Sequence, residues 1–267
     1  MNNLLMPDVL PRQHLFDLSG KTALVTGASR GIGAAIAKLF AAYGAHVIVS
    51  SRKLNVCEEI AAEIIAAGGK ASAMAANIGD LAAMDALFAE LDAQHIELDI
   101  LVNNAAANPY FGPMLDMPMD AFNKTTEVNI RGYWRMIQLA AQRMVKRQGD
   151  VRGSIINIAS VNGVRPAPMQ GVYSMSKAAV ISMTQVWARE LGTSGIRVNA
   201  ILPGLTETKF ASTLTQNPAI LKQILPIIPM HRVAQPDEIA PVALYLASAA
   251  SSYVTGSCHA VDGGFLS

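Results

Sequence analysis

The stretch that decides the fold is Thr26-Gly27-Ala28-Ser29-Arg30-Gly31-Ile32-Gly33. It follows a short apolar run at residues 22–26 and precedes a segment of helical periodicity at residues 34–43. Glycines at a strand-to-helix turn let the backbone approach a pyrophosphate, whose charge the N–H groups and dipole of the next helix stabilise. A glycine triplet also fits a plain tight turn, but this context favours a dinucleotide site. The residues expected to contact the dinucleotide are Gly27, Ser29, Arg30, Gly31, Ile32 and Gly33.

The same alternation of strand and helix patterns continues along the chain. Short runs rich in Val, Ile and Leu occur at residues 22–26, 47–50, 71–75, 100–102, 155–158 and 198–202. Segments of helical periodicity lie at 34–43, 56–67, 81–94, 121–147 and 174–191, and a helix near 236–249 and a strand near 257–261 complete the pattern. Such runs suit strands buried on both faces. They predict an α/β fold, a single-domain Rossmann-type doubly wound sheet of about seven mostly parallel strands with helices on both faces.

No linker or repeat divides the chain, so we expect an N-terminal extension at 1–17 and one dinucleotide-binding and catalytic domain at 18–267. The segment 205–232 lies between a strand and a helix and holds Pro218, Pro226 and Pro229. Loops of this length inside a compact domain are usually functional, often as lids, so we expect a substrate loop here. The alternative is a structural excursion with short helices of its own.

Composition and charge exclude several classes of protein. The 267 residues carry a formal net charge of +1 and 51% of them are hydrophobic. These values argue against disorder and against a nucleic-acid partner, because phosphate contacts need an excess of Lys and Arg. The uncharged stretch 239–261 is broken by Pro241 and several Ser and Thr, so we expect no membrane span. Cys57 and Cys258 fit neither a disulfide framework nor a metal motif, which favours a reduced, cytoplasmic location.

The end of the second strand indicates the cofactor. Sites for NAD place an acidic side chain there to accept from the ribose 2′-hydroxyl, whereas this chain has Ser50-Ser51-Arg52-Lys53. Arg52 can pair bidentately with a 2′-phosphate and Ser51 can donate to it, with Arg30 as a second cation. Arg52 and Lys53 would also serve simply to solvate a strand end. The residues favour NADP(H), with NAD(H) as the alternative.

Proton-transfer chemistry is expected in the second half of the chain. Tyr173 and Lys177 lie at i and i+4 at the start of a helix, and Ser160 follows the strand 155–158, at the carboxyl edge where open α/β folds bind ligands. A free Tyr has a pKa of about 10, and a nearby ammonium and an oxidised nicotinamide would lower it. Ser160 would hold a substrate oxygen against the Tyr hydroxyl. Separately these residues fit a surface pair and a turn; jointly they indicate an acid/base site.

These motifs resemble those of the short-chain dehydrogenase/reductase family, over about residues 18–264. The further matches to the family pattern are Asn103-Asn104-Ala105, Asn129, Pro203-Gly204 with Thr208, and Val261-Asp262-Gly263-Gly264. Two positions depart from it, since Ala106 stands where a glycine is usual and Asn77 where an Asp often contacts adenine. The cofactor contacts that the residues and the resemblance together imply, beyond the glycine turn, are Ser51, Arg52, Asn77, Ile78, Asn104, Ala105, Tyr173, Lys177, Pro203, Gly204 and Thr208.

The resemblance also implies a role for each catalytic residue. It makes Tyr173 the general acid/base, and it makes Lys177 both the group that lowers the pKa of Tyr173 and a ligand of the nicotinamide ribose. Ser160 would orient the substrate carbonyl. Asn129 would hold a water that links Lys177 to solvent, and Thr208 would bind the carboxamide of the nicotinamide.

Within the family, residues 50–53, 104–112 and 203–205 resemble the NADPH-dependent carbonyl and retinal reductase branch. This implies an oxidoreductase that interconverts a carbonyl and a secondary alcohol by hydride transfer and that forms a homo-oligomer, a tetramer by family resemblance. One alternative is a 3-oxoacyl carrier-protein reductase, and another is a catalytically silent nucleotide-binding scaffold. The residues expected to line the substrate pocket are Asn108, Tyr110, Asn162, Leu205 and Phe210.

Overall fold

The computed structural model describes residues 14–267, so residues 1–13 of the predicted N-terminal extension lie outside the described residues. One seven-stranded sheet runs through the protein in the order β3-β2-β1-β4-β5-β6-β7. Every neighbouring pair is parallel. The strands are β1 (Thr22–Thr26), β2 (His46–Ser51), β3 (Lys70–Ala75), β4 (Ile100–Asn103), β5 (Gly153–Ile158), β6 (Ile196–Pro203) and β7 (Cys258–Val261). The predicted Rossmann-type sheet is confirmed.

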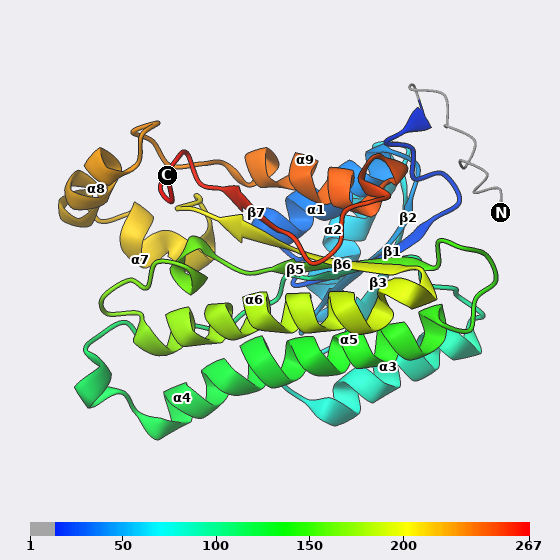
Figure 1. The fold of residues 1–267 in the computed structure, drawn as a ribbon, viewed down its shortest axis with the longest axis horizontal. Coiled ribbons are helices and arrows are strands. Elements are labelled where there is room, and N and C mark those ends of the chain that lie inside the picture. The colour runs from blue at the N-terminus through cyan, green and yellow to red at the C-terminus, as the bar shows by residue number, and fades with distance from the viewer. Residues whose placement is uncertain (1–13) are drawn as a thin grey trace, which may run out of the picture.

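Helices cover both faces of this sheet (Figure 1). One layer holds α1, α2 and α9, and the other holds α3, α4, α5 and α6. Among the described residues, no helix has both the length and the hydropathy that crossing a membrane requires. The helices are α1 (Gly31–Ala42), α2 (Leu54–Ala66), α3 (Leu81–Ala93), α4 (Met119–Thr126), α5 (Tyr133–Met144), α6 (Gly171–Leu191), α7 (Ser212–Thr215), α8 (Pro218–Ile224) and α9 (Pro236–Ala247).

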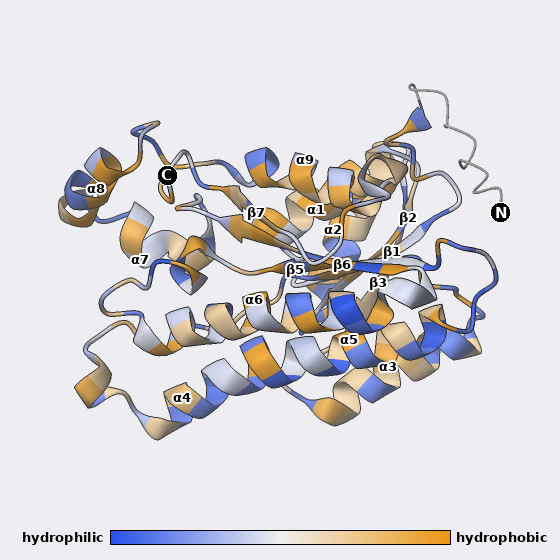
Figure 2. Cartoon of the chain, in the orientation of Figure 1, coloured by the Kyte–Doolittle hydropathy of each residue, from blue (hydrophilic) through white to orange (hydrophobic). Residues whose placement is uncertain are grey.

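Two apolar cores result, one on each face of the sheet. Neighbouring residues of a strand point to opposite faces, so Leu24 packs into the core under α3, α5 and α6, whereas Val25 packs into the core under α1, α2 and α9. The central strands are buried on both sides, and Figure 2 shows many apolar residues along the sheet with polar residues among them. Apolar runs without alternation are therefore what this sheet requires.

The strand order reverses between β1 and β4. In open α/β sheets such a reversal opens a crevice at the carboxyl ends of the strands, where ligands bind. The helices α7 and α8 lie at that end of the molecule, beside the C-terminus (Figure 1). The segment 205–232 thus contains short helices, which was one of the two interpretations of its sequence.

The helix predicted at 121–147 is not a single α-helix. It consists of α4, a π-helical turn (Glu127–Gly132) and α5. Gly132 packs closely against the loop that follows β3, and a Cβ at Gly132 would clash with the carbonyl oxygen of Ile78 in that loop. The π turn also leaves Asn129 and Tyr133 fully buried, four residues apart. Such turns often mark functional sites. The hydrophobic periodicity of the sequence does not distinguish a π turn from the α-helix around it.

Candidate active site

The glycine turn has the backbone geometry that a pyrophosphate site needs. Gly27 and Gly31 have φ values of 64° and 55°, a region that favours glycine. The α1 helix begins at Gly31, and its N-cap residue Arg30 makes no side-chain capping bond, so the first N–H groups stay available for an anion. A Cβ at Gly33 would clash with the Asn104 amide and lie 2.6 Å from the Gly27 carbonyl oxygen. These residues fit a dinucleotide phosphate.

The loop after β4 is tied to the glycine turn by one hydroxyl. Thr26 Oγ1 donates to the Val102 carbonyl at 3.2 Å and accepts from the backbone N–H groups of Asn104 and Ala105 at 3.0 and 3.2 Å. The Asn104 side-chain amide donates to the Thr26 carbonyl at 2.9 Å and to that of Gly27 at 3.2 Å. Asn104 therefore acts as a brace between the two loops.

The residues expected around the adenosine end follow β2 and β3. Within the described part of the chain, the guanidinium groups of Arg30 and Arg52 have no hydrogen bond or ion pair to another residue, so both remain available for a phosphate. Ser51 Oγ lies 3.1 Å from Cys57 Sγ. Asn77 uses its Oδ1 to accept from the Gly79 N–H at 3.1 Å, and Ile78 is buried. The side-chain oxygen of Asn77 is thus already engaged in its own turn.

The sequence-predicted Ser160, Tyr173 and Lys177 come together. Ser160 lies just past β5 and its Oγ accepts from the Asn162 N–H at 3.1 Å. Tyr173 and Lys177 lie one turn apart near the start of α6, and the Lys177 Nζ is 5.6 Å from the Tyr173 ring centroid. Tyr173 is 9% exposed and Lys177 is 1% exposed.

Burial controls the protonation of both groups. Burial raises the pKa of Tyr173 to about 12, although a hydrogen bond to Ser160 acts in the lowering direction. Burial lowers the pKa of Lys177 to about 7, because the buried ammonium is poorly solvated. We expected a lowered pKa for Tyr173, but with the protein groups alone the desolvation of the phenol outweighs the hydrogen bond to Ser160 and the pKa is raised.

Lys177 has a neighbour that the sequence did not suggest. Its Nζ donates to the Ile158 carbonyl oxygen at 2.7 Å and lies 3.5 Å from the hydroxyl of Tyr133. Tyr133 is fully buried, and its hydroxyl donates to the same carbonyl at 3.1 Å. The available signal was a large polar aromatic residue four positions after Asn129, and it was indistinguishable from an ordinary core residue.

The side chain of Asn129 bonds to Ala107 and Ser176 and makes no hydrogen bond to Lys177. Its Nδ2 donates to the Ala107 carbonyl and to Ser176 Oγ, both at 2.9 Å, and its Oδ1 accepts from the Ala107 N–H at 2.8 Å. Both amide hydrogens are thus used within the protein. The side chain thus fixes the loop after β4 against α6, and one lone pair of its oxygen remains for a water. The expected role of Asn129 in holding a water stays a prediction.

The residues after β6 lie beside the glycine turn. A Cβ at Gly31 would lie 3.1 Å from Thr208 Cγ2, and the Thr208 hydroxyl accepts from the Ala211 N–H at 3.2 Å. Gly204 bonds to the Val261 carbonyl, and a Cβ there would lie 2.7 Å from Asp262 Cα. The absence of a side chain at Gly204 therefore serves the packing of Pro203–Gly204 against the loop after β7.

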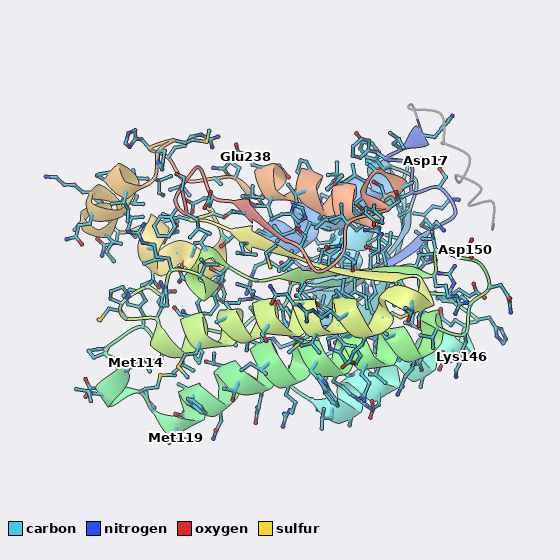
Figure 3. The ribbon with its side chains drawn as sticks, viewed as in Figure 1. Asp17, Met114, Met119, Lys146, Asp150 and Glu238 are labelled. Carbon is cyan, nitrogen blue, oxygen red and sulfur yellow. The ribbon has the colours of Figure 1, made fainter. Side chains whose placement is uncertain are left out.

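A pocket opens beside Tyr173. Of the five predicted substrate residues, Asn108 and Tyr110 line it, and the Phe210 ring packs 5.7 Å from the Tyr173 ring. Asn162 and Leu205 are not among its lining residues. Besides Tyr173, the lining also includes residues outside those five, namely Gly112, Met114, Met117, Met169, Gln170, Gly171 and Val172. Met114 and Met119 lie in a Met-rich segment at one end of the molecule, just before and at the start of α4 (Figure 3). The high methionine content of this segment was the signal that could have indicated these residues.

A doubly wound sheet with a glycine turn beside its reversal point and a buried Ser–Tyr–Lys cluster is typical of a dinucleotide-dependent oxidoreductase. Comparison with known proteins agrees. The family model described as Enoyl-(Acyl carrier protein) reductase matches residues 27–266. Dehydrogenase/reductase SDR family member 4 of Bos taurus is 36% identical over 250 residues, which is 94% of this chain and 88% of the relative.

Two solved structures extend the comparison. A gluconate 5-dehydrogenase from Burkholderia cenocepacia in complex with NADP and tartrate has a TM-score of 0.90 and 31% identity, covering 94% of this chain and 97% of that one. A 7α-hydroxysteroid dehydrogenase complexed with NADH and 7-oxo glycochenodeoxycholic acid has a TM-score of 0.89 and 35% identity, covering 96% and 98%. The chain belongs to the short-chain dehydrogenase/reductase family and is an oxidoreductase that acts on alcohol or carbonyl groups.

Proposed function

We propose that this protein interconverts a carbonyl and a secondary alcohol with NADP(H), and that Tyr173 is the general acid/base. The observation that carries the proposal is the cluster of Ser160, Tyr173 and Lys177 at the carboxyl edge of the sheet, with Tyr173 lining a pocket. Tyr173 and Lys177 come from adjacent turns of α6, and packing brings Ser160 to them from the segment after β5.

The residues have complementary parts in this reaction. When bound, the nicotinamide supplies the hydride for reduction or accepts it in oxidation. Tyr173 has a raised pKa of about 12, so its hydroxyl is protonated at neutral pH and can donate to the carbonyl oxygen. Ser160 bonds the same oxygen and fixes its position. The Lys177 ammonium stabilises the phenolate that proton donation leaves.

The preference for NADP(H) rests on the end of β2. Arg52 directly follows this strand and Arg30 lies in the glycine turn, and neither guanidinium has another partner among the described residues. A guanidinium without an internal partner can pair with a 2′-phosphate without breaking an existing bond. The two solved structures differ in cofactor, since the gluconate 5-dehydrogenase was solved with NADP and the hydroxysteroid dehydrogenase with NADH. The preference therefore rests on Arg52 and Arg30 of this chain.

The pocket lining mixes apolar and polar side chains and carries no positive charge. Its apolar side chains include Met114, Met117 and Met169, its polar side chains include Asn108 and Gln170, and it contains no Lys or Arg. A carboxylate is bound most strongly by a cation, which this lining lacks. Flexible methionines instead suit apolar groups of varied shape. We therefore place an uncharged carbonyl compound ahead of a polyhydroxy acid as substrate.

The alternatives have less support. An acidic carrier protein would need free cations, and Lys146 and Arg147 follow the end of α5, but Arg147 is paired with Asp99 at 2.8 Å and with Glu97 at 3.4 Å. A silent scaffold would not be expected to retain an assembled proton-transfer cluster. Neither alternative explains the contacts among Ser160, Tyr173 and Lys177 as well as the proposed oxidoreductase does.

We also propose a homo-oligomer. Trp134 on α5 and Met175 and Val186 on α6 are 44%, 54% and 50% exposed, so these two helices present large apolar side chains that a second copy of the chain could cover. Static light scattering at micromolar concentration should give a multiple of the 28.3 kDa chain mass, and a monomer would refute it. The tetrameric state and the cytoplasmic location remain predictions of the sequence.

The experiment that tests the function is a carbonyl panel with NADPH and with NADH, read by absorbance of the reduced cofactor. The panel pairs apolar cyclic ketones with keto-acids of sugars. Tyr173→Phe should lose about 10²–10⁴-fold in turnover and still bind the cofactor. Retained turnover in that variant would exclude Tyr173 as the acid/base, and faster turnover of the sugar acids would overturn the substrate class.

A further inference from the structure

We infer that Tyr133 is a positioning residue for the Lys177 ammonium, and that it helps Lys177 keep its proton. The inference rests on the proposed function of Tyr173 and Lys177. It concerns a residue on α5 that is fully buried, lies outside the lining of the pocket beside Tyr173, and was indicated by no sequence motif.

Three groups form a closed triangle below the active site. The Lys177 Nζ donates to the Ile158 carbonyl at 2.7 Å, the Tyr133 hydroxyl donates to the same oxygen at 3.1 Å, and the Nζ lies 3.5 Å from the Tyr133 hydroxyl. Because the Tyr133 proton is committed to Ile158, the lone pairs of its oxygen face the ammonium as acceptors. The Tyr133 ring adds a cation–π contact, with its centroid 5.1 Å from the Nζ.

The ammonium needs such acceptors because it has no counter-ion. Lys177 is 1% exposed, and no carboxylate pairs with it anywhere in residues 14–267. An ammonium has three hydrogens to satisfy, and a buried charge without hydrogen-bond partners is expensive. The Asn129 amide does not satisfy Lys177, because its atoms are bonded to Ala107 and Ser176. Tyr133 supplies what Asn129 does not.

The surroundings of Lys177 hold few groups that titrate. Tyr133 faces it from α5 and Tyr173 faces it from its own helix α6. From β5 the facing group is the Ile158 carbonyl, which does not titrate. Removing the Tyr133 oxygen therefore changes the balance between the ammonium and the neutral amine directly, while the ring and its packing remain.

Tyr133→Phe tests this assignment by its pH profile. Carbonyl reduction should fall with rising pH as Lys177 loses its proton, and in the variant this fall should occur about one pH unit lower than in the wild type. A merely structural role for Tyr133 would lower the melting temperature and leave the pH of the fall unchanged. The matched control is Thr125→Val, which deletes another fully buried hydroxyl that bonds only a backbone carbonyl on α4.

A second measurement is independent of turnover. Unfolding free energies of the wild type, Tyr133→Phe, Lys177→Met and the double variant form a double-mutant cycle, measured at pH 6 and pH 9.5. Tyr133→Phe should destabilise the wild type more at pH 6 than at pH 9.5, and the excess should vanish in the Lys177→Met background. An identical cost in both backgrounds would overturn the inference. If the wild type turned over no compound of the carbonyl panel while the cycle still showed coupling between Tyr133 and Lys177, only the proposed function would be refuted.

Discussion

Lys177→Met should stabilise the protein, although it should abolish catalysis. The wild-type ammonium is buried without a counter-ion, and burial lowers its pKa from 10.5 to about 7. The folded state therefore binds fewer protons than the unfolded state between these two pH values, so the wild type gains stability as pH rises through this window. Below about pH 7 the full penalty of the buried charge is present. Methionine has a similar length and carries no charge.

The size of the effect follows from the same contacts. A pKa lowered by about 3.5 units corresponds to about 5 kcal/mol at low pH. The variant loses a charge-assisted bond to the Ile158 carbonyl worth about 1.5–3 kcal/mol, but that carbonyl keeps the Tyr133 hydroxyl as a donor at 3.1 Å. A net gain of about 2–3 kcal/mol remains, which raises the melting temperature by roughly 5–10 °C in a domain of this size.

Thermal and urea unfolding of the cofactor-free protein at pH 6, 7.5 and 9.5 would measure this gain, at one protein concentration throughout. The advantage of Lys177→Met should be largest at pH 6 and should shrink as pH rises above 7. Lys222→Met, at an exposed lysine on α8, is the control and should show no such pH dependence. A less stable variant at pH 6, or a difference constant with pH, would refute the reasoning.

Three other predictions follow from the site. Arg52→Asp should move the ratio of kcat/KM values for NADPH and NADH toward NADH by at least about tenfold, and an unchanged ratio would exclude the 2′-phosphate contact. Gly33→Ala should lower the free energy of unfolding by about 1–3 kcal/mol and weaken cofactor binding, because its Cβ meets the Asn104 amide. Calorimetry of unfolding and of binding would measure both effects. Gly192→Ala is the near-neutral control, since a Cβ there meets nothing within 4 Å. Met117→Lys should lower kcat/KM for apolar ketones about tenfold or more, and equal rates would place the substrate elsewhere.

Much of the fold was accessible from the sequence because its signals are local. An apolar run such as β5 predicts a buried strand wherever it occurs, and the glycine turn carries its own phosphate geometry. The Tyr173–Lys177 pair was accessible for the same reason, since one helical turn brings both side chains to one face. The structure confirms the predicted sheet and brings Ser160 to that pair.

The rest depended on contacts between distant segments. The π turn at Glu127–Gly132 arises where Gly132 meets the Ile78 carbonyl, a contact that no periodicity records. The direction of the Tyr173 pKa shift depends on how deeply the ring is buried, which the spacing of motifs does not report. Met114 and Met117 were missed for a third reason: methionines at such positions are as common in cores as in pockets.

The hydrogen bonds of the Thr26 hydroxyl have a consequence for the order in which the protein folds. They join the hydroxyl to Val102, Asn104 and Ala105, which are 76 to 79 residues further along the chain. Bringing such distant segments together carries a loop-closure cost that is met only when β4 docks beside β1. The glycine turn thus gains its brace at a late, non-local step of folding. Binding of a fluorescent reduced dinucleotide during refolding would therefore report the pairing of these two strands, and not the earlier appearance of helices.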